Sequence, residues 1–476
     1  MRRAALCCLF SWLLFHLPAQ EAPAPDAPAT TPAPLALPAP AAPLPKAEFR
    51  ARREELARRL GERGGRAVVL VRGAAQRADM AAFVQDQDFL YLSGVAEPGL
   101  ALLLVVEDGA LARDELLVPP FSRFQATWNG DFLAPGEAAA ERTGFATVGN
   151  VRSLRRALDE LFEGDPGSWP VLYTLTEPAA PLGGTPGSAE EAAKATASDR
   201  FDGRTSRERR LVEALGTRLP GVTVESLERV LHAMRPVKSP AEQALIRHAT
   251  HVACEGIAEA MRAARPGLYE FQLAAVARYV FALRGAGPDA YAAIVGAGPN
   301  GCILHYNAGS RRIEPDDLIV MDYAPTVQGY CSDVTRTFPA SGTFSAAQKK
   351  LVQDVHEIQQ TLLAEVKPGA RISALYGKCA QLLIERGYRN DHGPTHHVGL
   401  AVHDPSVDVL QPGMVITVEP GAYLRDEGMG CRIEDTVLVT EDGHENLSAH
   451  LPSDPDGIEA LMRERSLVDV PVGLPR

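Results

Sequence analysis

The sequence of 476 residues predicts an α+β protein in which a smaller α/β region precedes a larger region of helices and mainly antiparallel strands. Two observations carry this prediction. Short apolar, β-branched runs of strand length recur with amphipathic stretches between residues 47 and 230. A new, capped helix then opens a second region, 237–465, which contains further helices and four more runs of strand length.

The residues ahead of these two regions predict a leader and a spacer. Two arginines precede the apolar run Ala4–Leu17, a pattern typical of a secretory signal over residues 1–20 and short for a membrane span. Retention of this segment as an uncleaved anchor is the alternative. Residues 21–46 form a linker, because nine prolines and nine alanines fill 18 of its first 25 positions and keep it extended. The protein is therefore expected to be secreted or periplasmic.

One helix and three strands are predicted in the first region. Arg50–Leu60 is a charged amphipathic stretch of helical length. Ala67–Arg72, Ala101–Val106 and Glu115–Val118 are apolar, β-branched runs of strand length. No catalytic cluster is visible in this region, so the chemistry is expected in the second one.

The second region begins with a strong helix signal. Ser239 can cap a helix, Pro240 suits the first helical position, and Glu242 can reach back to the cap. The other elements expected here are two helices, Leu273–Leu283 and Ser345–Leu363, and four strands, Leu318–Asp322, Tyr330–Phe338, Val415–Glu419 and Ile433–Thr440.

Charge and cysteine content exclude two classes of protein. The chain has 48 Lys+Arg against 60 Asp+Glu, a formal net charge of −12, and it lacks the basic run that phosphate binding needs. No nucleic-acid partner is therefore expected. Five of the seven cysteines lie beyond the leader without CxxC spacing, so they are interpreted as small buried residues rather than a disulfide scaffold.

Two motifs suggest a cofactor or metal site but fail on their context. Residues 296–301 fit the dinucleotide pattern GxGxxG, yet they contain a Pro-Asn-Gly turn where the pattern needs the start of a long helix. His392 and His396 have the HxxxH spacing of helical zinc ligands, yet the Gly-Pro pair between them disrupts such a helix. The sequence also lacks the GxSxG motif, so a serine hydrolase has no support.

Five side chains of the second region predict a metal centre. Asp322 ends an apolar run, and Asp333 follows 11 residues later, beyond a turn that can bring the two carboxylates together. Glu419 ends another apolar run, Glu434 interrupts a third, and His396 lies in a histidine-rich loop. Acids within apolar strands are costly to bury unless they are paired or bind a metal. Four carboxylates balance two divalent cations, and oxygen-rich ligation with one imidazole suits Mn, Co, Fe or Zn.

These residues belong to stretches that carry a family resemblance. The stretches are Asn300–Tyr306, Ser332–Phe338, His396–Asp404, Val418–Gly421 and Arg432–Asp435 in the second region, and Asp88–Gly94 and Trp128–Gly130 in the first. They resemble the pita-bread metallopeptidases of family M24, namely Xaa-Pro aminopeptidase (aminopeptidase P), Xaa-Pro dipeptidase (prolidase) and methionine aminopeptidase. The resemblance implies a pita-bread catalytic domain over 237–465 and an aminopeptidase P-type domain over 47–230. Methionine aminopeptidase is disfavoured because it usually lacks such an N-terminal domain.

The resemblance implies a site for two divalent metal ions, usually manganese, with Co, Fe or Zn as alternatives. The implied ligands are Asp322 for one cation, Asp333 and Glu434 for both, and His396 and Glu419 for the other. His397 is a rival ligand, but the family motif His-x-x-Gly-Leu-x-Val-His-Asp aligns on His396.

Roles for further residues follow from the same resemblance. Two cations lower the pKa of a bound water, which can then attack the carbonyl of the scissile bond. Glu419 would move a proton towards the leaving prolyl nitrogen, and Arg432 would hold a neighbouring carboxylate in place. The histidines that would orient the substrate and stabilise the tetrahedral intermediate are His305, His392 and His403.

The expected activity is removal of one residue ahead of proline from peptides with an Xaa-Pro N-terminus. A prolidase that cleaves Xaa-Pro dipeptides is the close alternative. A pita-bread protein that binds peptides without catalysis is more remote, because all five ligand positions are filled. The resemblance also implies a homo-oligomer, and no membrane span is expected after removal of the signal.

Overall fold

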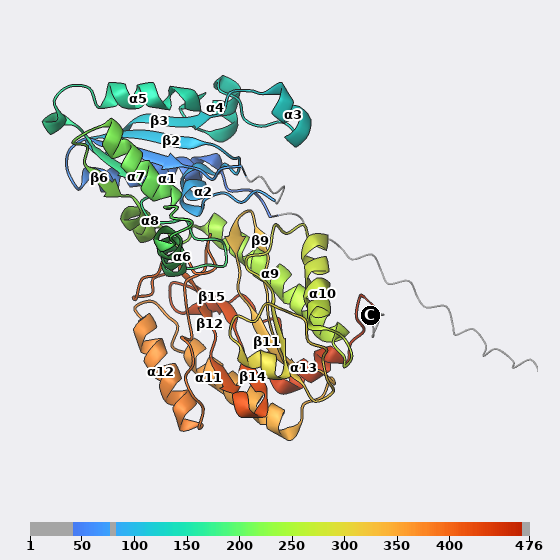
Figure 1. Ribbon diagram of the computed structural model, residues 1–476. Coiled ribbons are helices and arrows are strands. Elements are labelled where there is room, and N and C mark those ends of the chain that lie inside the picture. The colour runs from blue at the N-terminus through green and yellow to red at the C-terminus, as the bar shows by residue number, and fades with distance from the viewer. Residues whose placement is uncertain (1–40, 77–81, 469–476) are drawn as a thin grey trace, which may run out of the picture. The chain divides into compact units, whose positions relative to one another are not determined.

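The computed structural model describes residues 41–76 and 82–468 (Figure 1). The predicted signal, 1–20, and most of the predicted linker, 21–46, lie outside these residues. The last linker residues contact the folded body, where Gln328 Nε2 donates a hydrogen bond of 2.7 Å to the carbonyl oxygen of Ala41. No helix within the two described ranges is long and apolar enough to cross a membrane.

The N-terminal region is built on one six-stranded mixed sheet, in the order β4-β3-β2-β1-β5-β6. All three predicted strands are present. β1 and β2 are buried almost throughout, because apolar residues occupy both faces of these central strands. The strands are β1 (Ala67–Arg72), β2 (Ala101–Glu107), β3 (Ala110–Val118), β4 (Thr147–Asn150), β5 (Val171–Thr174) and β6 (Val224–Ser226).

Helices cover both faces of this sheet. The predicted first helix is confirmed as α1 (Lys46–Gly61), which packs Leu56 and Leu60 against one face. α5 (Leu154–Leu161) and α7 (Arg207–Arg218) pack against the other face. The remaining helices of the region are α2 (Gln87–Ser93), α3 (Arg123–Asn129), α4 (Glu137–Thr143), α6 (Pro186–Ser198) and α8 (Glu228–Met234).

The second region opens with α9 (Pro240–Ala263), as predicted. The Ser239 hydroxyl accepts a hydrogen bond from the Glu242 N–H at 3.2 Å, and Glu242 Oε2 accepts one from the Ser239 N–H at 2.8 Å. This capping box confirms the sequence signal. The later helices are α10 (Glu270–Leu283) and α11 (Ala346–Leu363), both predicted, and α12 (Ile372–Glu385) and α13 (Pro455–Met462), which were not.

The predicted strand Tyr330–Phe338 is wrong as a single element. Tyr330–Cys331 (β10) pairs with Thr326–Val327 (β9), whereas Thr335–Pro339 (β11) pairs with Leu318–Asp322 (β8). At the break, the Asp333 N–H donates to the side-chain hydroxyl of Thr436, at 3.2 Å, instead of to the backbone carbonyl of a ladder partner. The break turns Asp333 out of the ladder.

Small antiparallel sheets make up the rest of the second region. β12 and β15 are shorter than the predicted strands, so Glu419 and Glu434 lie just beyond the ladders. The sheets have the orders β11-β8-β7, β12-β15-β16, β13-β14 and β10-β9. The strands not yet given are β7 (Ile294–Ala297), β12 (Val415–Val418), β13 (Gly421–Leu424), β14 (Met429–Arg432), β15 (Asp435–Val439) and β16 (His444–Asn446).

Buried charged groups join the two regions. Arg52 of α1 pairs with Glu242 of α9 at 3.1 Å. Arg235, directly after α8, pairs with Asp404 at the end of the histidine-rich loop. The N-terminal region therefore packs close to the loop that carries His396.

Candidate active site

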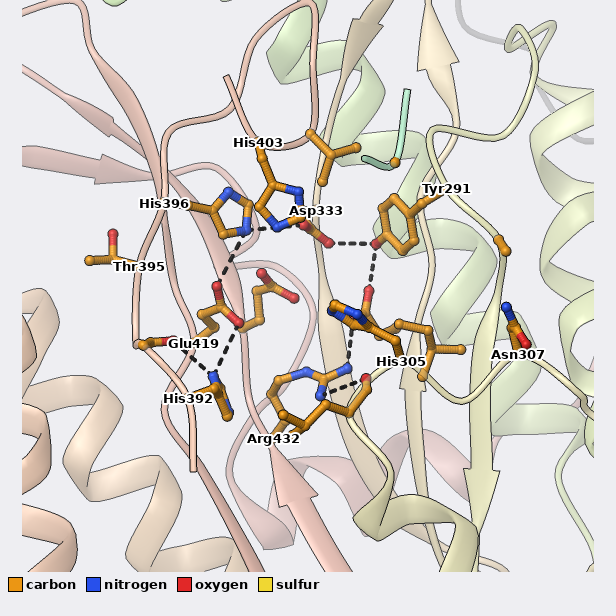
Figure 2. A pocket seen from close by; sticks show the side chains of 18 of the residues that line it. Tyr291, His305, Asn307, Asp333, His392, Thr395, His396, His403, Glu419 and Arg432 are labelled. Atoms are coloured by element: carbon orange, nitrogen blue, oxygen red, sulfur yellow. Dashed lines mark hydrogen bonds and ion pairs between the residues drawn. The ribbon is translucent and has the colours of Figure 1, made fainter. Parts of the chain in front are cut away.

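A cavity of about 390 Å³ lies where several short strands of the second region end (Figure 2). All nine residues predicted to act in the site line it. Asp322 is the last residue of β8, Asp333 lies between β10 and β11, Glu419 follows β12, and Glu434 lies between β14 and β15. The acids therefore stand at strand ends, which gather around one cavity.

Asp333, His396 and Glu434 form the tightest group. One candidate ligand atom from each of them lies within 4.8 Å of the others. His396 Nε2 lies 3.4 Å from Asp333 Oδ2 and 3.3 Å from Glu419 Oε1. The Nδ1 atom of the same ring lies 3.1 Å from the carbonyl oxygen of His397, which orients the ring with Nε2 towards the carboxylates.

His397 points away from this group. Its side chain is fully buried, and its Nε2 lies 3.2 Å from the carbonyl oxygen of Val407. Burial, together with the charge of Lys238, lowers the pKa of His397 to about 4. Of the two adjacent histidines, the structure thus places His396 among the carboxylates.

Two threonines fix carboxylates of the site. Thr335 Oγ1 donates to Glu434 Oε2 at 2.6 Å, and Thr417 Oγ1 donates to Glu419 Oε1 at 3.1 Å. Each threonine lies on a strand next to the acid that it holds. Neither threonine stands out in the sequence, because threonine is common in strands for reasons unrelated to a site.

Arg432 connects one predicted ligand to one predicted substrate-binding histidine. Its Nη2 donates to Asp322 Oδ2 at 2.7 Å, and its Nη1 donates to the hydroxyl of Tyr423 at 3.1 Å. The Tyr423 hydroxyl lies 3.0 Å from Nε2 of His392. Burial lowers the pKa of Arg432, but the neighbouring charges outweigh it and hold the pKa well above its usual value.

Tyr291 is the main residue of the site that sequence reasoning missed. Its hydroxyl lies 2.5 Å from both Asp322 Oδ1 and Asp333 Oδ1, so one O–H group is shared by two carboxylates (Figure 2). Burial and the charge of Asp322 raise the pKa of Tyr291 well above its usual value, so the phenol keeps its proton. A single tyrosine in the loop before β7 belongs to no motif that would have revealed it.

The cavity carries an excess of negative charge. Among the described residues that line it, Arg432 is the one lysine or arginine, and it faces four acids. Burial and the charge of Asp322 raise the pKa of Asp333 to about 7, and burial and Asp333 raise that of Glu434 well above its usual value. Burial lowers the pKa of His396, but Asp333 and Glu419 outweigh it and raise the pKa to about 9. Clustered acids that repel one another in this way form a donor set that suits divalent cations.

The three other predicted histidines surround the carboxylates (Figure 2). The ring of His403 lies 4.3 Å, centroid to centroid, from that of His396, and burial together with the charge of His396 lowers the pKa of His403 to about 3. His392 Nδ1 lies 2.8 Å from the carbonyl oxygen of Gly393 and 3.8 Å from Glu419 Oε2. His305 is more exposed to solvent than the other two.

The structure confirms that neither the GxGxxG match nor the HxxxH pair has the helix that its motif requires. Residues 296–301 run from β7 into the short 3₁₀ turn Gly298–Cys302, so they open no long helix. His392 and His396 lie on an irregular loop, yet both line the cavity. The irregular loop, and not the spacing of residues on a helix, therefore places both histidines at the cavity.

Comparison with known proteins agrees with this geometry. The profile of metallopeptidase family M24 matches residues 244–441, and the profile of the aminopeptidase P N-terminal domain matches residues 49–169. The Xaa-Pro aminopeptidase of Escherichia coli (strain K12) is 30% identical in an alignment of length 455 that covers 88% of this chain and 98% of the relative. The chain belongs to metallopeptidase family M24.

This M24 protein also resembles solved structures of the family. Zn-substituted E. coli aminopeptidase P in complex with product superposes with a TM-score of 0.74, at 28% identity, over 88% of this chain and 99% of the other. An Xaa-Pro dipeptidase of Pyrococcus horikoshii is 34% identical over 232 residues, which cover only 47% of this chain and 66% of that relative. The protein is a metal-dependent exopeptidase. Its pita-bread catalytic domain follows a smaller N-terminal domain along the chain, as the sequence predicted.

Proposed function

We propose that this M24 exopeptidase removes the first residue from peptides whose second residue is proline, and that it does so with two divalent cations. One observation carries the proposal, namely that four acids and His396 converge on a cavity with one arginine and no lysine in its described lining. The relative named Xaa-Pro aminopeptidase matches both regions of the chain, whereas the dipeptidase match covers less than half of it. This difference favours the aminopeptidase over the dipeptidase.

The donor set fits a pair of hard or borderline cations, with manganese as the first candidate and Co, Fe or Zn as alternatives. The proposed ligands are Asp322 for one cation, Asp333 and Glu434 for both, and His396 and Glu419 for the other. When bound, the cations would supply Lewis acidity that activates water and polarises the scissile carbonyl. Thr335, Thr417 and Arg432 hold the ligating carboxylates in place beforehand.

Glu419 is the proposed proton carrier. Thr417 fixes its Oε1, while its Oε2 faces the ring of His392 across 3.8 Å. A carboxylate held in this way can take a proton from the attacking water and pass it on to the leaving nitrogen. An amine leaves the tetrahedral intermediate only once its nitrogen is protonated, so this proton decides whether the prolyl nitrogen can leave.

The remaining predicted residues would act on the substrate. We propose that His305, His392 and His403 bind its carbonyl groups and stabilise the tetrahedral intermediate. The lowered pKa of His403 means that it acts as a neutral ring. Through Tyr423, Arg432 also orients His392, so one arginine steadies both the metal side and the substrate side of the cavity.

A substrate panel tests the proposed reaction. The metal-free protein reloaded with Mn²⁺ should release the first residue from a tetrapeptide Xaa-Pro-Xaa-Xaa at least about 100-fold faster than from the matched Xaa-Ala peptide, measured by mass spectrometry. If the protein cleaves the dipeptide Xaa-Pro but not the tetrapeptide, it is a prolidase instead. Reloading with Co²⁺, Fe²⁺ or Zn²⁺ in parallel ranks the cations.

Two proposals concern the protein outside the cavity. We propose that residues 1–20 direct export, because their basic start and apolar run are typical of a secretory signal. We also propose that the protein is a homo-oligomer, because M24 relatives commonly form one. The acidic net charge of −12 gives no support for nucleic acid as a partner.

A further inference from the structure

A loop of the N-terminal region reaches the active-site cavity. Residues 175–185 connect β5 to α6, and Gly183 of this loop lines the cavity together with the predicted ligands. The loop is held on both sides of that residue. The carbonyl oxygen of Leu182 accepts a hydrogen bond from the Val402 N–H at 3.4 Å, and the Gly184 N–H donates to Pro181 at 2.9 Å.

Gly183 lies directly against Tyr291. A Cβ atom on Gly183 would lie 2.7 Å from Cβ of Tyr291, closer than Cβ atoms approach other atoms in proteins, and 3.2 Å from its Cα, which is a tight contact. The backbone of Gly183 is not in the left-handed region that favours glycine. The contact with Tyr291, rather than the backbone conformation, therefore requires a residue without a side chain here.

Tyr291 transmits this contact to the carboxylates. Its hydroxyl lies 2.5 Å from oxygens of both Asp322 and Asp333, so a displacement of a few tenths of an ångström would lengthen or break these hydrogen bonds. Groups that orient the ligands of a metal commonly change its affinity by 10- to 100-fold when they are lost.

We propose that Gly183 is a positioning residue for the metal centre, which gives Tyr291 the room to hold Asp322 and Asp333 together. The inference rests on the proposed cation pair. It also assigns the N-terminal region a direct part in the site, because a loop of that region sets the position of two ligands in the other.

Manganese binding by the full-length metal-free protein tests this role. Free Mn²⁺ is followed by electron paramagnetic resonance in the wild type, Gly183→Ala, Tyr291→Phe and the double variant. Gly183→Ala and Tyr291→Phe should each weaken binding of at least one Mn²⁺ by about 10-fold, and the double variant should bind no more weakly than Tyr291→Phe. Gly184→Ala is the matched control, because its Cβ would press on the ring of Pro181, at 2.8 Å, in the same loop.

The outcomes separate the possible explanations. Wild-type affinity in Gly183→Ala, equal losses in Gly183→Ala and Gly184→Ala, or additive losses in the double variant would each overturn the role of Gly183. Thermal unfolding of every variant without metal shows that it is folded during the titration. A wild type that binds no stoichiometric Mn²⁺ would instead overturn the cation pair itself.

Discussion

Two groups of buried carboxylates flank the histidine-rich loop and differ in their charge balance. At the end of the loop, Asp404 contacts Arg235 and Lys238, and Arg235 also pairs with Asp88 at 2.7 Å. This group contains two acids, one arginine and one lysine. In the active-site cavity, four acids face Arg432 and four histidines, of which His396 has a raised pKa.

The pKa shifts of the two groups have opposite signs. Burial raises the pKa of Asp404, but the charges of Arg235 and Lys238 outweigh burial and lower it. Burial and Asp322 instead raise the pKa of Asp333 to about 7. The first group is therefore complete within the protein, whereas the second needs added positive charge. Charge balance, more than the number of acids, separates a structural group from a metal centre.

Replacement of Asp333 should give the largest effect. Asp333→Asn keeps the shape of the side chain but removes a proposed bridging ligand, so kcat/KM for an Xaa-Pro peptide should fall by about 1000-fold or more. The metal-free variant should unfold at no lower urea concentration than the metal-free wild type, because a repelling charge has been removed. A variant that retained wild-type activity would refute the metal centre, and one that unfolded earlier would refute the charge imbalance.

The same chemical change at Asp404 should act on stability instead. Asp404→Asn leaves the buried Arg235 and Lys238 without their shared counter-charge, so the free energy of unfolding should fall by about 3 kcal/mol in urea titrations. Glu445→Gln is the control, because its ion pair with Arg247 is exposed and should contribute little. Equal stability of Asp404→Asn and the control would show that the balanced group is not a structural pair.

The sequence revealed the acids of the cavity because they interrupt apolar runs. Asp322 and Glu419 directly follow short apolar stretches of strand length. A carboxylate at such a position is costly to bury unless it is paired or binds a metal. The helix from Pro240 could be predicted for a similar reason, since its capping box is a local signal. Local patterns of this kind depend on a few neighbouring residues.

The rest of the site depends on contacts between distant segments. Tyr291 and Gly183 lie in irregular loops, and their positions depend on the packing of the two regions. The break between β10 and β11 could not be predicted because it depends on contacts with distant segments, among them the hydrogen bonds from Asp333 N–H to Thr436 and from Cys331 N–H to Gly399. Such contacts leave no periodicity in the sequence, so single-sequence reasoning could not find them.

The smallest expected effect is on the pH dependence of the metal-free protein. The folded state raises the pKa of Asp333 to about 7 from an unfolded value near 4, so protonation of this acid stabilises the fold at low pH. The charge on His396, whose pKa is raised to about 9, acts in the same direction. Between about pH 5 and pH 8, Asp333 and His396 should therefore lower the thermal midpoint of the metal-free wild type as pH rises. Histidines with lowered pKa values act in the opposite direction below about pH 6.5, so the contribution of Asp333 is read from the difference between wild type and variant.

Three proteins compared by thermal unfolding across that range give the test. Asp333→Asn should show a shallower fall than the wild type, because one of the titrating groups is gone and its repulsion of Asp322 and Glu434 is relieved. Asp404→Asn removes an acid whose pKa is lowered and which stays ionised throughout this window, so the fall that Asp333 causes should remain in this variant. Saturating Mn²⁺ should flatten the wild-type curve, since the bound cations hold the carboxylates ionised at every pH in the range. A slope that is the same in all three proteins and unaffected by Mn²⁺ would mean that the pH dependence arises outside the cavity.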